Sequence, residues 1–428
     1  AIIAGVLILT ISAQTHAEAI SEDSLLALYQ QLHANPELSF QEKQTATRIA
    51  RELRDAGFRV TEGIGGYGLV AVLENGPGPT LMLRADMDAL PVKEQTGLPY
   101  SSTATATLDD GSRVPVMHAC GHDIHMTVLV GTARNLAARR ATWRGTLLLV
   151  VEPAEERGAG ARLMLADGLF ERFPRPDYNL ALHANAELPA GTIGYTRGYA
   201  MANVDSVDIN VRGIGGHGAY PHKTRDPVVL AAQLVLQLQT IVSREISPLE
   251  SAVITVGSIH GGSKHNIIGD SVKLQLTVRS YSDETRDLLL RRIREMSLGL
   301  ARTAGLPEEL LPVVEIKEEY TPSVFNDPEL TGRVVSVLSS ELGENQVQAL
   351  PPAMAGEDFA RYGRTEPRIP SVLFWLGAVD PELYAAAKEK GESLPALHSP
   401  RFAPLAQPAI ETGVRAFTAL AQDLLGPE

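Results

Sequence analysis

The stretch Thr146-Leu-Leu-Leu-Val-Val-Glu-Pro-Ala-Glu-Glu156 joins an unbroken apolar segment to a group of carboxylates. Its Leu and Val residues predict a strand that is buried on both faces, as strands of a parallel sheet are. Because α/β sheets place their functional groups where strands end, Glu152, Glu155 and Glu156 are expected at such an edge. The adjacent Glu155 and Glu156 suit a site in which one carboxylate binds a metal ion and the other accepts a proton from water. A solvated acidic turn is the alternative, and this segment alone favours it.

The chain around this segment alternates short strands with helices. Further strands are predicted at 68–73 and 80–84, and helical periodicity extends over 24–57, 126–139 and 160–169. Gly57 is expected just beyond the end of the first helical stretch. This alternation predicts an α/β fold with a largely parallel sheet.

A second group of potential ligands lies in Met117-His-Ala-Cys-Gly-His-Asp-Ile-His125. These nine residues contain three of the 11 histidines and the only cysteine of the chain. Gly121 permits a tight backbone path, which would let Cys120 and His122 converge on one metal ion. Core histidines beside a buried thiol are the alternative, but the clustering favours a metal site.

Three other residues fit the same site, although each signal is weak alone. His183 ends the apolar run 180–182, and His398 lies in the turn Leu394-Pro-Ala-Leu-His398-Ser-Pro. Asp88 lies just after the strand predicted at 80–84 and could hold a ligating histidine in place.

The pattern of strands and helices restarts near residue 200. Strands are predicted at 204–211, 252–260, 271–280 and 311–317, and helices at 227–241 and 283–303. This β-α-β-β-α-β order fits a ferredoxin-like α+β module. We predict that the module, residues 200–318, is inserted into a metal-binding α/β domain formed by 18–199 and 319–428, because His398 completes the site of the first part.

Composition and the N-terminal segment indicate which partners and which cellular location to expect. The formal net charge of −13 argues against nucleic acid and anionic membrane surfaces as partners. A single cysteine excludes an intrachain disulfide. Residues 1–11 are uncharged and apolar, and small residues come after them, so 1–17 is predicted to be a signal peptide. We therefore expect export, to the periplasm or the medium, and no integral membrane span in the mature form.

Together, these segments resemble the family of two-metal aminoacylases and carboxypeptidases, and within it the branch of hippurate hydrolases and indoleacetyl-amino-acid hydrolases. The matching segments occur in family order from about residue 25 onward, and the cysteine-containing segment is specific to that branch. They are Leu32-His-Ala-Asn-Pro-Glu-Leu38, Arg84-Ala-Asp-Met-Asp-Ala-Leu-Pro91, Met117-His-Ala-Cys-Gly-His-Asp123, Glu152-Pro-Ala-Glu-Glu156, Gly215-Gly-His-Gly-Ala219 with Pro221-His222, Gly356-Glu-Asp-Phe359 and Leu397-His398.

The resemblance implies a role for each matching residue. The implied ligands of two divalent ions are Cys120, His122, Glu156, His183 and His398, with Cys120 as the candidate bridge. Zn is the expected metal, and Mn, Co and Ni are alternatives. Glu155 is implied as the general base that accepts a proton from the metal-activated water.

The inserted module is implied to close over the substrate and to mediate a homodimer. His217 would reach the site of a partner subunit and stabilise the oxyanion, while Asn266 and Arg279 would bind the substrate's free carboxylate. The chain departs from the family pattern at Glu152, where Gln is usual, and at Arg157, where a Gly-rich stretch is usual. We expect both positions to affect substrate preference.

The implied function is a metal-dependent amidohydrolase that cleaves the amide bond of N-acyl amino acids or related conjugates. A carboxypeptidase or dipeptidase is the alternative within the family, and a catalytically silent metal-binding homologue is the alternative of another class. The segment Gly63-Ile-Gly-Gly-Tyr-Gly68 matches a dinucleotide fingerprint, but the residues after it are strand-like rather than helical, so we interpret it as a turn. No G-x-S-x-G segment supports a serine hydrolase.

Overall fold

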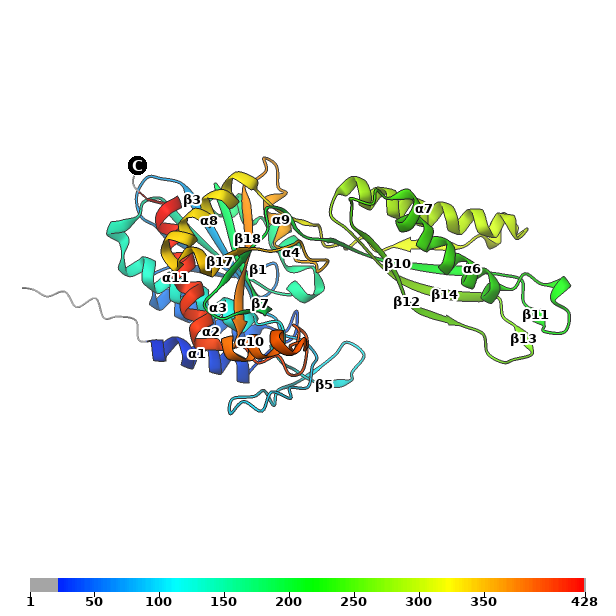
Figure 1. Ribbon diagram of the computed structural model, residues 1–428, viewed down its shortest axis with the longest axis horizontal. Coiled ribbons are helices and arrows are strands. Elements are labelled where there is room, and N and C mark those ends of the chain that lie inside the picture. Colours follow the sequence, from blue (N-terminus) through cyan, green and yellow to red (C-terminus); the bar gives the residue numbers. More distant parts are fainter. Residues whose placement is uncertain (1–21, 427–428) are drawn as a thin grey trace, which may run out of the picture.

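The computed structural model describes residues 22–426, which form a larger α/β domain and an elongated α+β domain beside it (Figure 1). We call the elongated part, from Asn203 to Ile316, the lid domain. The predicted signal peptide, 1–17, lies outside the described residues.

The larger domain is built on an eight-stranded mixed sheet, as described within 22–426, with the order β1-β2-β6-β3-β7-β18-β8-β17. The central pairs β6·β3, β3·β7 and β7·β18 are parallel, as the sequence predicted. The strands are β1 (Arg59–Ile64), β2 (Gly68–Glu74), β3 (Thr80–Asp86), β6 (Thr146–Glu152), β7 (Tyr178–Pro189), β8 (Ile193–Tyr195), β17 (Val347–Ala349) and β18 (Ser371–Val379).

Helices cover both faces of this sheet, which is why the strand sequences are apolar without alternation. In β6, Leu147 and Leu149 face one hydrophobic core, and Leu148 and Val150 face the other. The first core is closed by α1 (Glu22–Ala34), α2 (Lys43–Asp55), α3 (His122–Ala138), α8 (Pro328–Leu342) and α11 (Ala406–Leu424). The second is closed by α4 (Gly160–Ala166), α5 (Leu169–Arg172) and α9 (Ala360–Gly363), while α10 (Pro381–Lys390) packs near the end of β7.

The prediction of a single helical stretch at 24–57 is wrong, because the structure contains two separate helices there, α1 and α2. Pro36 has no N–H group and disfavours helical backbone at Asn35, so the first helix ends at Ala34. Gly57 lies where it was expected, with φ +89 and its N–H donating to the carbonyl of Arg54. Gly63–Gly68 is the turn of the β1–β2 hairpin rather than a dinucleotide site, because it leads into a strand and not into a helix.

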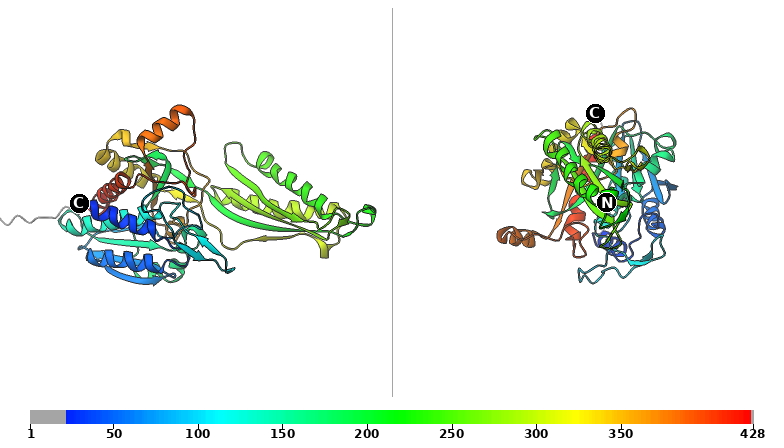
Figure 2. Two further views of the ribbon diagram at one scale, coloured as in Figure 1. Left: turned by 90° about the horizontal axis from the view of Figure 1, so that it is seen from below. Right: turned by 90° about the vertical axis from the view of Figure 1, so that its right-hand side faces the viewer.

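The lid domain has the ferredoxin-like sheet order β12-β14-β10-β15, with all neighbours antiparallel. Its strands are β10 (Asn203–Arg212), β12 (Ala252–Gly261), β14 (Ser271–Ser280) and β15 (Val313–Ile316), and its long helices are α6 (Pro227–Thr240) and α7 (Asp283–Thr303). Both helices pack on one face of the sheet. The short strands β11 (Gly216–His217) and β13 (Ile267–Ile268) pair at the end of the lid that points away from the larger domain (Figures 1 and 2).

Residues Pro227–Glu245, which comprise α6 and the turn after it, are long and apolar enough to cross a membrane by length and composition alone. The side chains of Leu230, Leu234 and Leu238 in this segment pack in the lid core. Packing inside the lid accounts for these three side chains, whereas Val228, Val229 and Leu236 of the same segment are exposed.

A buried histidine ties α1 to α3 and to the loop after β3. The Nδ1 of His33 lies 2.7 Å from Asp123 Oδ2, and its Nε2 lies 3.1 Å from Glu94 Oε1. Burial opposes protonation of His33, but its hydrogen bonds to the two carboxylates outweigh this and raise its pKa to about 10. A protonated imidazole therefore bridges two buried carboxylates.

We expect His33→Gln to lower the free energy of unfolding at pH 6 by about 3 kcal/mol, because two buried carboxylates lose their cation. The folded-state pKa of His33 is raised, so its contribution is full below about pH 6.5 and declines as the pH rises toward 10. Urea unfolding at pH 6 and pH 9.5 measures the effect, with Gln31→Ala, an exposed change on the same helix, as the control. An equal difference between variant and wild type at both pH values would contradict a charged His33.

Candidate metal centre

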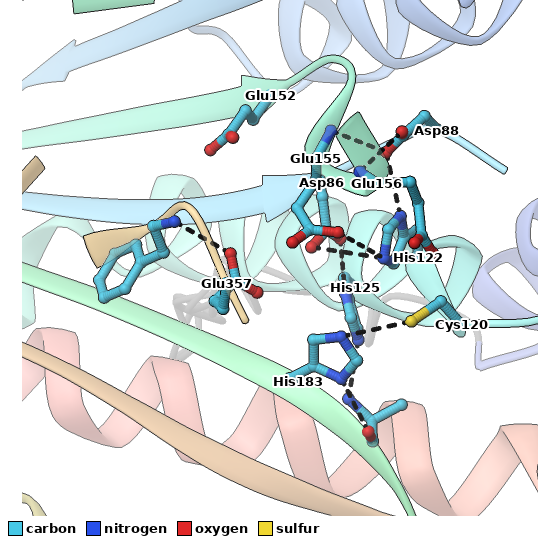
Figure 3. A network of polar contacts seen from close by, with 12 residues as sticks. Asp86, Asp88, Cys120, His122, His125, Glu152, Glu155, Glu156, His183 and Glu357 are labelled. Atoms are coloured by element: carbon cyan, nitrogen blue, oxygen red, sulfur yellow. Dashed lines mark hydrogen bonds and ion pairs between the residues drawn. The ribbon is translucent and has the colours of Figure 1, made fainter. Parts of the chain in front are cut away.

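Four of the potential ligands lie together in Figure 3, and they come from the start of α3, the turn after β6 and the middle of β7. His183 was expected at the end of its strand, but β7 continues beyond it to Pro189. Cys120 and His122 lie at the start of α3, where Gly121 has φ +83. A Cβ at position 121 would lie 2.9 Å from the Cβ of Ala184 on β7, so only glycine lets this turn approach the strand. This turn brings Cys120 and His122 beside His183, which β7 carries.

Cys120 lies at the centre of the group. Its Sγ is 3.6 Å from Nε2 of His183 and 3.2 Å from Nε2 of His398. The same nitrogen of His398 is 3.4 Å from Oε1 of Glu156. His398 reaches this position from a loop in which its own φ is +67 and its N–H donates to the carbonyl of Ala119.

The ligand atoms fall into two groups of three that share Cys120. Cys120, His122 and His183 form one group, and Cys120, Glu156 and His398 form the other, with all ligand atoms of a group within 4.8 Å of one another. Thiolate, imidazole and carboxylate are the donor types that Zn and related ions bind. The structure therefore brings together all five predicted ligands, in an arrangement that suits two ions and a bridging sulfur.

Buried polar atoms without hydrogen bonds indicate that this group is built to hold cations. Among residues 22–426, Nε2 of His122 and Oε1 of Glu156 are buried and form no hydrogen bond. Burial, together with the nearby carboxylates of Glu156 and Glu155, raises the pKa of the Cys120 thiol well above its usual range. Divalent ions would satisfy these donors and displace the thiol proton, so the residues fit a two-metal centre.

Glu155 stands beside the ligands. Its Oε2 lies 3.9 Å from Nε2 of His122, and its side chain lines the same cavity as Cys120 and His398. Burial, and then the carboxylates of Glu357 and Glu156, raise the pKa of Glu155 well above its usual range. A carboxylate of this kind can accept and hold a proton at neutral pH.

Asp88 fixes both the turn that carries the two glutamates and one of the histidines. Its carboxylate accepts the backbone N–H groups of Glu155 at 3.2 Å and Glu156 at 3.1 Å, and its Oδ1 lies 3.3 Å from Nδ1 of His122. It thus leaves Nε2 of His122 for a metal, which is the orienting position predicted for Asp88.

Asp86 and His125 extend this support through a contact that the sequence did not indicate. Asp86 Oδ1 lies 2.6 Å from Nδ1 of His125, and Nε2 of His125 accepts the N–H of Ala184 at 2.8 Å. Neither histidine position nor carboxylate spacing in the sequence indicates this link, because β3 and α3 meet only in the folded chain.

A buried arginine lies beneath the centre and was also not predicted. Arg84, with no side-chain exposure, contacts four carboxylates at distances between 2.6 and 3.4 Å, and they belong to Asp86, Glu152, Glu357 and Asp358. Glu152 also accepts the hydroxyl of Tyr362 at 2.9 Å and does not line the metal cavity. The sequence did contain a signal for this cluster, because Arg84 stands inside an otherwise apolar strand. A buried cation requires buried anions, so carboxylates could have been expected around it.

The lid residues predicted to bind substrate are separated in the structure. Arg279 lines the metal cavity, which has a volume of about 580 Å³, and donates to the carbonyl of Met354 at 2.7 Å. His217 and Asn266 instead lie at the far tip of the lid, exposed and joined where the N–H of Gly218 donates to the carbonyl of Asn266 (Figure 1). Within one chain, the structure does not bring Asn266 to the cavity that Arg279 lines.

Comparison with known proteins identifies the family. The sequence pattern described as peptidase family M20/M25/M40 matches residues 82–422. The chain belongs to peptidase family M20/M25/M40. It is therefore a metal-dependent amidohydrolase, as the sequence predicted.

Two relatives from the M20 group are deacetylases by name. The chain is 35% identical to N-acetyldiaminopimelate deacetylase of Lactobacillus helveticus (strain DPC 4571), over 85% of its own length and 91% of the relative. It is 36% identical to N-acetyl-L-cysteine deacetylase of Bacillus subtilis (strain 168), over 83% and 82%. Among solved structures, the Bacillus subtilis YXEP protein, described as a dinuclear metal binding peptidase from the M20 family, superposes with a TM-score of 0.74 at 29% identity, covering 94% of this chain and 98% of that one.

Replacement of the shared ligand provides a test of the metal centre. We expect Cys120→Ser to lower the affinity for metal at least about tenfold, because a hydroxyl is a poor substitute for a thiolate in both groups. Metal content after dialysis against a graded chelator measures the loss, and His260→Gln, at an exposed histidine of the lid, is the control. Full retention of two ions by the Cys120 variant would exclude a bridging sulfur.

Proposed function

We propose that the protein hydrolyses the amide bond of N-acyl amino acids, using Glu155 as general base at a two-metal centre formed by Cys120 with His122, Glu156, His183 and His398. The observation that carries the proposal is the sharing of Cys120 by two groups of ligand atoms, beside a cavity that Glu155 also lines. The deacetylase names of the M20 relatives support an acyl group on the nitrogen of an amino acid.

The side chains divide the reaction among themselves. When bound, the ions supply Lewis-acid activation of the amide carbonyl and of water. Glu155 takes the proton from the attacking water and returns it to the leaving nitrogen. Asp88 accepts the backbone N–H of Glu155 and so holds this residue in position. Arg279, which lines the same cavity, can bind the α-carboxylate and so orient the amide toward the ligands.

Glu155→Gln should retain two metal ions and lose at least about a hundredfold in kcat on N-acetyl amino acids, because the amide cannot accept a proton. Metal analysis and steady-state kinetics are measured on the same sample, with the exposed Glu171→Gln as the control. Near-wild-type turnover by the metal-loaded Glu155 variant would exclude this base. A panel that includes dipeptides separates the amidase from a dipeptidase.

We further propose that the active unit is a homodimer in which His217 of the partner subunit completes each site, together with Asn266 of the partner subunit. His217 is exposed, and its strand β11 lies at the end of the lid that points away from the larger domain (Figure 1). The lid also exposes apolar side chains, among them Leu236 on α6, 72% exposed, and Ile259 on the sheet-edge strand β12, 54% exposed. Open strand edges and exposed apolar groups of this kind support pairing through the lid.

Mixing two inactive variants tests whether His217 acts between subunits. We expect His217→Ala and Glu155→Gln to be nearly inactive alone and to regain about a quarter of wild-type activity when co-assembled, since about half of the dimers are mixed and one site in each is complete. The assay compares kcat/KM before and after co-refolding of equal amounts. If mixing gave no gain in activity while both variants were dimeric and metal-loaded, His217 would not act in the site of the partner subunit.

A further inference from the structure

Arg157 places a positive charge at the metal cavity, and none of the residues that the structure describes pairs with it. It is the last residue of the short 3-10 turn Glu155–Arg157, and its exposed side chain lines the cavity with Glu155, Glu156 and His398. Within 22–426, its guanidinium forms no hydrogen bond or ion pair. The five donors of this group therefore remain available to a ligand in the cavity.

The backbone that carries Arg157 is held firmly. Asp88 accepts the N–H groups of the two preceding residues, as described above. The next residue, Gly158, has φ +59 and packs so closely on the segment after β15 that a Cβ there would lie 2.4 Å from Oγ1 of Thr321. The position of Arg157 along the cavity wall is therefore fixed, and only its side chain has freedom.

The other charges of the cavity already have partners or tasks. Glu155 faces the ligand His122, and Glu156 is itself one of the proposed metal ligands. Glu319, the other carboxylate among the lining residues, is bound by Arg162 at 2.7 Å. Arg279 is available for the α-carboxylate of the substrate. A substrate with one carboxylate would therefore leave Arg157 without a counterion.

We propose that Arg157 is a specificity-determining residue that binds a second anionic group of the substrate. The inference rests on the proposed function and narrows it to N-acyl amino acids with a second carboxylate, located in the acyl group or in the amino-acid side chain. A guanidinium recognises a carboxylate through two parallel hydrogen bonds, which a neutral amide of the same shape cannot match.

Matched substrate pairs test the proposal and distinguish the two locations. N-acetylglutamate is compared with N-acetylglutamine, and N-succinylalanine with its neutral amide N-succinamoylalanine, using the full chain loaded with zinc or manganese. We expect wild type to prefer the anionic member of one pair by at least about tenfold in kcat/KM, as a charge-assisted hydrogen bond would give. Arg157→Gln should bring that ratio close to one, Arg157→Lys should restore part of it, and Arg172→Gln, on α5 and outside the cavity, should leave it unchanged.

Binding measurements keep this proposal separate from the proposed function. Calorimetry on the Glu155→Gln protein, with and without Arg157→Gln, gives the Kd for both members of each pair without turnover. Selective binding of the anionic member that depends on Arg157 supports the proposal, even if no substrate is hydrolysed and the proposed function fails. Equal discrimination with and without Arg157, in both pairs and both assays, would overturn it.

Discussion

The concentration of buried negative charge around the metal ligands constrains the rest of this structure. Four carboxylates surround one arginine, Arg84, and three more, those of Asp88, Glu155 and Glu156, lie around the metal ligands. Such a group is costly to bury unless cations compensate it. The parallel strands, the turn at Gly121 and the loop of His398 all serve to place donors around the ions that supply this compensation.

The proposed roles are divided between the two domains. The ligands and the base belong to the larger domain, where β3, β6, β7 and α3 are packed on both sides. The lid contributes Arg279 from a strand that runs toward the cavity, and it presents His217 and Asn266 at its far end. The residues proposed for the chemistry thus belong to the packed sheet and its connections, whereas those proposed for substrate recognition lie on the lid.

The sequence predicted the bounds of several individual strands and helices well. The bounds of β14 and α7 agree with the periodicity at 271–280 and 283–303, because alternating and helical burial are local signals. The break at Pro36 was missed, since apolar spacing continued across it. Arg84 and its carboxylates were not recognised as one cluster, because the partners come from three separate parts of the chain. The separation of Asn266 from Arg279 was not predicted either. It depends on the length and direction of the lid, and no sequence motif encodes these.

The unequal exposure of the two groups of ligands has a kinetic consequence. His122 and His183 are buried, whereas the side chain of His398 is 55% exposed. The backbone of His398 is in the left-handed region, and its side chain lines the cavity. An ion held by His398 and Glu156 would lie on the more exposed side of the centre. An ion held by the two buried histidines would be covered by more of the protein. The outer ion would therefore exchange with solvent faster than the inner one, and in a metal-poor environment the outer position would empty first.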